Sequence, residues 1–395
     1  MEKCGILIVG IAGYGELYVK ALMEQNRLSW VKGVVDIYPE HSSYFKTIIE
    51  MGIPIFSSLE EFYEVANADL AIISTPIHLH APQAIKAMKN GSHVLCEKPM
   101  SGSWQEAEQM RKVRDQTGRF LAVGFNWSFT DSVNDLKNDI NRGLFGKPLR
   151  GRTIVLWPRN EAYYNRCNWA GKLYGPNGEA IFDSIANNAA SHFFHHLLYV
   201  LGETEEQSAK LHSLDIELYR ANPIETFDTC ALRAKTDQSV ELMYFASHAL
   251  NKEYGPEFEL EFEEATIHYK VDSKMKAIWH NGREKDYGDP ESEHMRKLDI
   301  CIQKALKGET NIRCGIEASY SHMLAIKSMH EAVPEIPTVS YPYIQKDPET
   351  TITSIIGLED TLMNCYKKRI LPKETDSIWT NCGNIIEISS ESYPY

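Results

Sequence analysis

A small-residue turn between an apolar run and a helix-compatible segment is the feature that most constrains the fold. Residues 6–9 are consecutively apolar, and Gly10, Ala12 and Gly15 follow in the spacing Gly-x-(Gly/Ala)-x-x-Gly. Such residues allow a tight turn, close approach of the backbone to a pyrophosphate and packing of helix on strand. The phosphate lies at the helix amino terminus, where backbone amides and the dipole attract an anion. An ordinary tight turn is the alternative, since the motif alone is weak.

A second apolar run, residues 31–35, ends in Asp36. In dinucleotide-binding folds an acidic residue about 20 positions after the glycines binds the ribose hydroxyls of adenosine. Ile37 and Tyr38 follow, without an arginine to receive a 2′-phosphate. The sequence therefore favours NAD over NADP, although Asp36 could also be a turn or helix-capping aspartate.

The strand–helix alternation continues through residue 124 and predicts a doubly wound parallel sheet. We expect helices at 41–51, from 59, at 82–90 and at 104–116, and strands at 53–56, 70–74, 93–96 and 120–124. Ser58 and Ser103 are predicted helix caps. Right-handed crossovers place the carboxyl ends of such strands along one edge, where ligands bind. Five loops meet there: 10–15, Asp36, Thr75-Pro76, Glu97-Lys98 and Phe125-Asn126.

Lys98 stands at the carboxyl end of the strand at 93–96, and Pro99 ends that strand sharply. A lysine in this position suits proton transfer or substrate binding. Glu97 beside it tends to raise its pKa by charge pairing, which favours a hydrogen-bond donor role. The alternative is a surface salt-bridge residue next to a turn.

These motifs, together with the order Thr75-Pro76-Ile77-His78-Leu79-His80, Glu97-Lys98-Pro99 and Gly124-Phe125-Asn126, resemble the Gfo/Idh/MocA family of NAD(P)-dependent sugar and polyol oxidoreductases. The resemblance implies that Lys98 meets the substrate hydroxyl or carbonyl. His80 has an alternative role in starting the helix expected at Pro82. The cofactor-binding residues we expect are Gly10, Ala12, Gly13, Tyr14, Gly15, Asp36, Ile37, Thr75, Pro76, His80, Glu97 and Asn126.

The second half of the chain has strand periodicity of two. Phe258, Leu260 and Phe262 alternate with glutamates, which indicates an antiparallel sheet with one face packed on helices. We therefore expect a Rossmann domain at 1–125 and an α+β substrate and oligomerisation domain at 126–395, whose last helices and tail could instead pack on the first domain. The resemblance implies that the sheet pairs with a second copy, as a homodimer or homotetramer. The acidic alternation could equally be a solvated face.

Residues 157–192 alternate aromatic and amide side chains, which suit stacking on sugar rings and recognition of hydroxyls. The family usually carries Asp-x-x-x-His in this region, where this chain offers Asp183 with Asn187 or, five residues on, Asn188 with His192. Asn187 cannot exchange a proton near neutral pH and His192 can, so His192 is the expected acid/base residue. The substrate-binding residues we expect are Lys98, Arg159, Tyr164, Trp169, Asp183, Asn187, Asn188 and His192.

His192 also has two alternatives. It could be a core histidine on a helix that carries His195 and His196. The three histidines could also bind a metal, but no carboxylate or cysteine lies close enough in sequence to complete a site, so we expect none.

Composition excludes several classes of partner. A net charge of −13 without a basic stripe argues against nucleic acid, and no run of ~18 apolar residues predicts a membrane span. Eight scattered cysteines and an amino terminus without signal-peptide character indicate a cytoplasmic protein.

The sequence thus predicts NAD-dependent hydride transfer to or from a secondary hydroxyl of a sugar, polyol or glycoside. One alternative is a glycoside-cleaving enzyme that retains NAD and forms a transient keto-sugar. A lesser one is a non-catalytic NAD or sugar sensor. The substrate and the carbon that reacts are not specified by the sequence.

Overall fold

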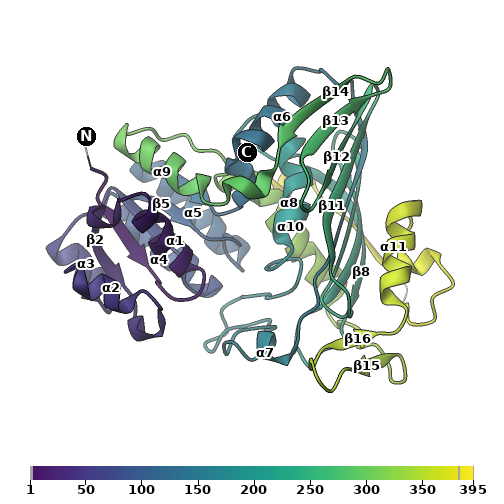
Figure 1. Ribbon diagram of the computed structural model, residues 1–395, viewed down its shortest axis with the longest axis horizontal. Helices are drawn as coiled ribbons and strands as arrows, with labels where there is room; N and C mark the ends of the chain where they lie inside the picture. The colour runs from purple at the N-terminus through teal and green to yellow at the C-terminus, as the bar shows by residue number, and fades with distance from the viewer. Residues whose placement is uncertain (1–2, 381–382, 395) are drawn as a thin grey trace. The chain divides into compact units, whose positions relative to one another are not determined.

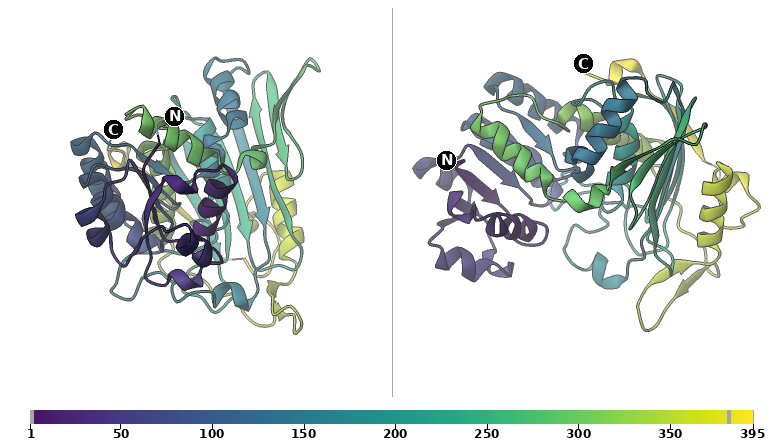
Figure 2. Two further views of the ribbon diagram at one scale, coloured as in Figure 1. Left: turned by 60° about the vertical axis from the view of Figure 1, so that its left-hand side comes forward. Right: turned by 45° about the horizontal axis from the view of Figure 1, so that its top comes forward.

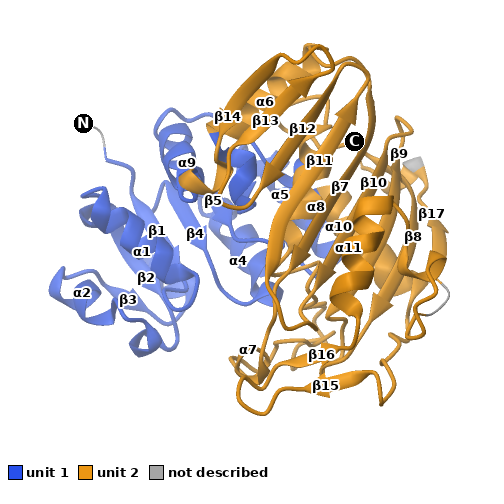
Figure 3. Cartoon of the chain, turned by 45° about the vertical axis from the view of Figure 1, so that its right-hand side comes forward, with its two compact units in different colours: residues 1–130, 293–319 blue, residues 131–292, 320–395 orange. Residues whose placement is uncertain are grey.

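The computed structural model describes residues 3–380 and 383–394, so Cys382 lies outside the described residues. The chain forms two compact units (Figure 3). Unit 1 comprises residues 1–130 and 293–319, and unit 2 comprises residues 131–292 and 320–395. The segment 293–319 thus returns to the first unit, whereas the expected boundary at 125/126 stays a prediction. No helix among the described residues is long and apolar enough to cross a bilayer.

Unit 1 is built on a six-stranded parallel sheet in the order β3-β2-β1-β4-β5-β6, of which Figure 3 labels β1 to β5, and this confirms the predicted doubly wound fold. The strands are β1 Ile6–Val9, β2 Val31–Val35, β3 Ile55–Phe56, β4 Leu70–Ile73, β5 His93–Cys96 and β6 Leu121–Val123. The apolar side chains of β1, β4 and β6 are fully buried. Burial on both faces explains why these strands are uniformly apolar.

The helices of unit 1 are α1 Gly15–Glu24, α2 Phe45–Glu50, α3 Leu59–Val65, α4 Ile77–Lys89, α5 Trp104–Thr117 and α9 Arg296–Leu306. Short 3-10 helices lie at Leu28–Trp30, Pro39–His41 and Asn126–Phe129, and a further one at Pro290–Glu293 spans the boundary with unit 2. Ser58 and Ser103 cap α3 and α5 as predicted, since their hydroxyls accept the backbone N–H of Glu61 and Glu106. Gly118 ends α5 with φ +63°.

The predicted start of α4 at Pro82 is wrong, because the helix begins at Ile77 and Pro82 lies inside it. Pro76 stands immediately before the helix with φ −56°, so its ring already sets a helix-compatible φ there. A proline as the sixth residue of a helix removes one backbone hydrogen bond, which the rest of the helix tolerates. His80 is therefore a residue of the helix and does not precede it.

Unit 2 contains a nine-stranded sheet in the order β14-β13-β12-β11-β7-β10-β9-β8-β17. All neighbours pair antiparallel except β7 with β10, as the predicted α+β domain requires. The strands are β7 Pro148–Leu156, β8 Leu211–Tyr219, β9 Thr229–Thr236, β10 Glu241–Ser247, β11 Tyr254–Phe262, β12 Ala265–Lys270, β13 Met275–Trp279, β14 Glu284–Gly288 and β17 Asn384–Glu387. A separate ribbon pairs β15 Ile344–Lys346 with β16 Thr353–Ile355.

The helices of unit 2 are α6 Asp131–Asn141, α7 Glu161–Tyr164, α8 Ser191–Val200 and α11 Leu358–Lys368, and α10 Ile316–Ala332 runs into it from unit 1. One face of the sheet packs on α8 (Figure 1). Phe258, Leu260 and Phe262 are buried on that face, as their alternation predicted.

The opposite face of the sheet is partly covered by the chain itself. Helix α11, yellow in Figure 2, lies over the central strands, where Leu358 and Leu362 join a core with Ile154 and Phe245. The acidic stripe of β11 is also paired within the chain: Arg369 and Arg152 bind Glu259 at 2.7 and 2.8 Å. The alternation of apolar and acidic residues predicted this acidic stripe, but it could not identify Arg152 and Arg369 as its partners, because they are far away in the sequence.

Candidate functional site

The loop after β1 has the geometry of an anion cradle. Gly10 and Gly13 have φ of +83° and +57°, values that glycine adopts without strain. A Cβ on Gly15 would lie 2.2 Å from the Gly10 carbonyl oxygen, so only glycine lets α1 start against the turn. The amides of Ala12, Gly13 and Tyr14 have no hydrogen-bond acceptor within 3–380 and 383–394. Three unbonded amides at a helix start fit a pyrophosphate.

Gly15→Ala should weaken NAD binding by about 100-fold or more, because its methyl group displaces α1 from the turn. Gly118→Ala is the control: unlike Gly15 it sits at positive φ, but no atom lies within 4 Å of an added Cβ there. It should cost about 1 kcal/mol of stability and leave NAD affinity unchanged. Calorimetric titration with NAD measures both. Equal NAD affinities in the two variants would contradict the cradle.

Asp36 ends β2 beside this cradle. Its Oδ2 accepts the Ile11 N–H at 2.8 Å and its Oδ1 accepts the Tyr38 N–H at 2.9 Å. The carboxylate is half-buried and keeps lone pairs for two hydroxyl groups. Ile37 is 67% exposed next to it and offers an apolar surface. The residues of this edge therefore fit the adenosine end of NAD.

His80 contacts the loops that follow β4 and β5 at the same sheet edge. Its Nδ1 lies 2.8 Å from the Pro99 carbonyl oxygen and its Nε2 lies 2.8 Å from the Thr75 carbonyl oxygen. Burial lowers its pKa, although both carbonyls oppose this, and a neutral ring can donate to only one of them. Thr75 donates its hydroxyl to Gln83 at 2.5 Å. These contacts favour a role for His80 in holding the loops after β4 and β5.

Glu97 lies at the centre of a buried charge cluster. Its Oε1 accepts the Tyr18 hydroxyl at 2.5 Å and also pairs with the Lys297 ammonium, and its Oε2 accepts the Lys98 N–H at 3.2 Å. Burial by itself raises the pKa of Glu97, but the Lys297 charge and these hydrogen bonds outweigh it and the pKa is lowered. Glu97 is therefore ionised although it is buried.

Tyr14 connects this cluster to Asn126 and His294. Its hydroxyl lies 3.2 Å from the Asn126 Oδ1, 3.0 Å from the His294 Nε2 and 3.2 Å from the Lys297 Nζ. Two predicted cofactor residues thus meet directly. Sequence reasoning missed His294 and Lys297, which come from the return segment. The only sign in the sequence that these two residues could act together was their spacing of three positions at the start of α9.

In unit 2, residues 185–190 form turns and α8 begins only at Ser191, so Asp183 and His192 do not lie on one helix. Asp183 accepts the Gly171 N–H and the Asn188 side-chain amide, both at 2.7 Å. The Asn187 amide donates to the carbonyl oxygens of residues 181 and 182 at 3.3 and 3.1 Å. These local bonds compete with helix formation. As a result, Asp183 is hydrogen-bonded to Asn188, and the side chain of Asn187 is hydrogen-bonded to the backbone.

The three histidines of α8 differ in burial. His195 and His196 are each 1% exposed, and burial lowers the pKa of His196 to about 3 and holds the pKa of His195 well below its usual value. His192, in the first turn of α8, is only half-buried. No group of three or more histidine, cysteine or acidic side chains that could hold a metal occurs in the described part of the chain.

Aromatic residues and arginines form a layer in the loop after β7. The Arg166 guanidinium lies 3.9 Å from the Tyr163 ring centre and 5.4 Å from that of Trp169, and it approaches Asp183 at 3.6 Å. The Arg159 guanidinium lies 5.2 Å from the Tyr163 ring. Two predicted substrate residues, Trp169 and Arg159, thus belong to one layer of stacked side chains. The sequence analysis did not predict Arg166, because a single arginine forms no recognisable motif.

Tyr164 belongs to the same loop. Its hydroxyl is buried and has no hydrogen-bond partner among the described residues. Burial raises its pKa well above the usual value, and the charge of Asp228 adds to this. The hydroxyl is therefore a neutral donor, as a residue that recognises a ligand oxygen should be.

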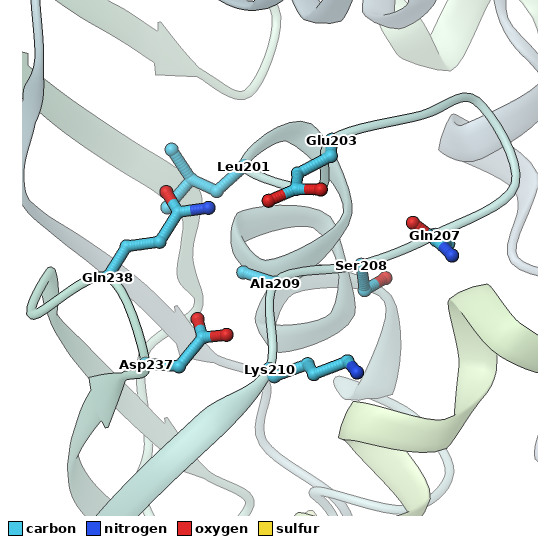
Figure 4. A pocket seen from close by; sticks show the side chains of 8 residues that line it. All are labelled: Leu201, Glu203, Gln207, Ser208, Ala209, Lys210, Asp237 and Gln238. Carbon is cyan, nitrogen blue, oxygen red and sulfur yellow. The ribbon is translucent and has the colours of Figure 1, made fainter. Parts of the chain in front are cut away.

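A separate pocket of about 260 Å³ lies at the end of α8 (Figure 4). It is lined by Leu201, Glu203, Gln207, Ser208, Ala209, Lys210, Asp237 and Gln238. None of the predicted site residues lines it.

Comparison with known proteins finds relatives of the first part of the chain among oxidoreductases. The profile of an oxidoreductase family with an NAD-binding Rossmann fold matches residues 4–125. The chain is 30% identical over 150 residues to a 2,7-anhydro-N-acetylneuraminate hydratase of Mediterraneibacter gnavus, which covers 38% of each protein. It is 31% identical over 150 residues to the glucose-6-phosphate 3-dehydrogenase of Bacillus subtilis, which covers 38% of this chain and 41% of that protein. The chain thus spans about two-fifths of these curated relatives.

Solved structures match over a longer stretch. The WlbA dehydrogenase of Bordetella pertussis, in complex with NADH and UDP-GlcNAcA, has a TM-score of 0.69 at 20% identity and covers 84% of this chain and 97% of that one. A levoglucosan dehydrogenase in complex with NADH and levoglucosan has a TM-score of 0.69 at 16% identity, over 84% and 98%. At these identities the likeness shows the fold, which spans both units.

Proposed function

We propose that the chain is an oxidoreductase of the Gfo/Idh/MocA family that transfers a hydride between NAD and a secondary hydroxyl or ketone of a sugar, polyol or glycoside. The match of residues 4–125 to an oxidoreductase family with an NAD-binding Rossmann fold supports this proposal. The observation that carries the proposal is the placement of Lys98. It follows β5 at the sheet edge that also holds the Gly10–Gly15 cradle and Asp36. The curated relative named glucose-6-phosphate 3-dehydrogenase supports the sugar class of substrate.

Two side chains of this chain carry the proton chemistry in the proposal. Bound NAD supplies the hydride acceptor when the substrate is oxidised. Lys98 donates a hydrogen bond to the substrate oxygen, and His192 takes the hydroxyl proton as the C–H bond is lost. The half-buried position of His192 supports this assignment over the fully buried His195 and His196. Tyr164, Trp169 and Arg159 would bind the sugar ring and its hydroxyls.

A second candidate is the cleavage of a glycoside or anhydro-sugar through a transient keto-sugar, with NAD retained. The relative named as an anhydroneuraminate hydratase favours it. Both reactions begin with the same hydride transfer, so the same residues serve both. The lesser alternative, a sensor without turnover, is disfavoured by the presence of Lys98.

The decisive experiment incubates the chain and NAD with a panel of sugars, polyols and glycosides, while NADH absorbance and product mass are followed. A dehydrogenase should release one NADH per product molecule, and that product should have lost two hydrogens. The glycoside-cleaving alternative should yield cleaved product while no NADH accumulates. NAD binding without product from any compound, despite an intact fold, would contradict both.

Assembly and location are also proposals. A homodimer or homotetramer through the sheet of unit 2 would use the strands β11 to β14, because α11 covers β7 and β10. The described cysteines, residues 4, 96, 167, 230, 301, 314 and 365, form no disulfide, which supports a reducing compartment such as the cytoplasm.

A further inference from the structure

Lys297 is a fully buried lysine that the proposed mechanism does not use. It lies on α9, and its ammonium donates to Glu97 Oε1, to the Tyr14 hydroxyl at 3.2 Å and to the Gly124 carbonyl oxygen at 3.3 Å. It also lies 4.7 and 5.2 Å from the ring centres of Tyr14 and Tyr18. A lysine is almost never buried completely without a defined charge partner. Here that partner is Glu97.

The Glu97 carboxylate is fixed in one position. Its two oxygens accept three hydrogen bonds, from Tyr18, Lys297 and the Lys98 backbone. An added Cβ on Gly124 would lie 2.8 Å from Glu97 Oε1, so the carboxylate packs directly against the Gly124 backbone. The group therefore cannot swing toward another partner without breaking this packing.

The charge balance of the cluster depends on Lys297. Burial lowers the pKa of Lys297, but the charge of Glu97 and their hydrogen bond outweigh it and raise the pKa, so the pair is ionised. Lys98 also acts on the charge of Glu97. If Lys297 were removed, the adjacent Lys98 would remain as a cation that acts on the buried carboxylate. A buried charge without its partner is strongly destabilising, so the carboxylate would then attract the Lys98 ammonium.

We propose that Lys297 is a positioning residue: as the counter-ion of Glu97, it prevents that carboxylate from competing with the substrate oxygen for the Lys98 ammonium. The inference rests on the proposed function, in which Lys98 binds that oxygen. Helix α9, which carries Lys297, would therefore influence the reactivity of Lys98. Without Lys297, the Lys98 ammonium would pair with Glu97 and would not be available to the substrate oxygen.

The reactivity of the Lys98 amine tests this without any substrate. Only the neutral amine is acylated, so acetic anhydride at pH 8, followed by mass spectrometry of the peptide that contains Lys98, measures its neutral fraction. In the full-length chain, Lys297→Met should lower the acylation rate of Lys98 by about tenfold, since a nearby opposite charge favours the charged form. Lys304→Met is the matched control: it lies on the same helix and pairs with Glu309. It should leave the rate unchanged.

The double variant Glu97→Gln/Lys297→Met removes both charges and should restore the wild-type acylation rate of Lys98. It also serves if Lys297→Met alone does not fold. The inference is overturned if a folded Lys297→Met labels at Lys98 within twofold of wild type, or if the double variant labels tenfold more slowly. Where a substrate is known, kcat of Lys297→Met should fall with the labelling rate while the NAD dissociation constant stays within about threefold. Absence of turnover in the wild type would refute the proposed function and leave the labelling result valid.

Discussion

Lys98→Ala should lower kcat by about 100-fold or more and leave the NAD dissociation constant within about threefold. The change removes the donor that the mechanism assigns to the substrate oxygen, whereas the cradle amides and Asp36 do not depend on that side chain. Because charge develops on this oxygen during hydride transfer, the lost interaction is stronger in the transition state than in the bound substrate. Steady-state kinetics and NAD titration separate the two effects.

Two further variants control this experiment. Lys89→Ala, on the exposed end of α4, removes a lysine from the same unit and should leave kcat unchanged. Lys98→Arg keeps the charge but changes the position of the donors, so its kcat should lie between those of wild type and alanine. Near-normal turnover of Lys98→Ala would refute the assignment of Lys98.

The nucleotide-binding unit could be predicted from the sequence because each element there has a local cause. The apolar strands, the serine caps at 58 and 103 and the small residues between 10 and 15 each act over a few positions. Their order determines a parallel sheet whose loops meet at one edge. The start of α4 was the exception, because a proline is tolerated both before and inside the first turns of a helix.

The charge cluster around Glu97 could not be predicted in the same way. Its partner Lys297 lies 200 positions away in the chain and His294 is 168 positions from Asn126. A lysine on a helix is usually a solvated surface residue, and no local pattern distinguishes the one that is buried. The return of α9 to the sheet had to be seen before this lysine could be given a partner.

The outer face of the sheet in unit 2 shows a similar limit. The alternation of the glutamates at 257, 259 and 261 correctly predicted a strand, and it left open a solvated face beside the oligomeric one that the family resemblance implied. Arg152, a neighbouring position on β7, and Arg369, which follows α11, bind Glu259 there. Much of the face is therefore closed by the chain's own last helix, and a second copy could contact the remaining strands only.

The choice between Asn187 and His192 yields the second large effect. His192→Asn should lower kcat by about 100-fold, within the range for loss of a general base, and should abolish the rise of kcat with pH. The sign follows from the chemistry: an imidazole accepts a proton only when neutral, so a histidine base makes kcat rise with pH until the ring has lost its proton. A pH series of kcat for wild type and variant measures both. A variant with the wild-type pH profile would exclude His192 as the base.

Asn187→Ala should act on stability instead. Asn187 is 2% exposed, and its amide donates to the carbonyl oxygens of Ile181 and Phe182. Removing it leaves these buried carbonyls with one donor fewer, at a cost of about 1–3 kcal/mol. Urea denaturation should show this loss, while kcat of the folded fraction keeps the wild-type pH profile. If Asn187→Ala instead lowered kcat about 100-fold at unchanged stability, Asn187 would be a substrate-binding residue in the register of Asp183 with Asn187, and the assignment of His192 would lose its support.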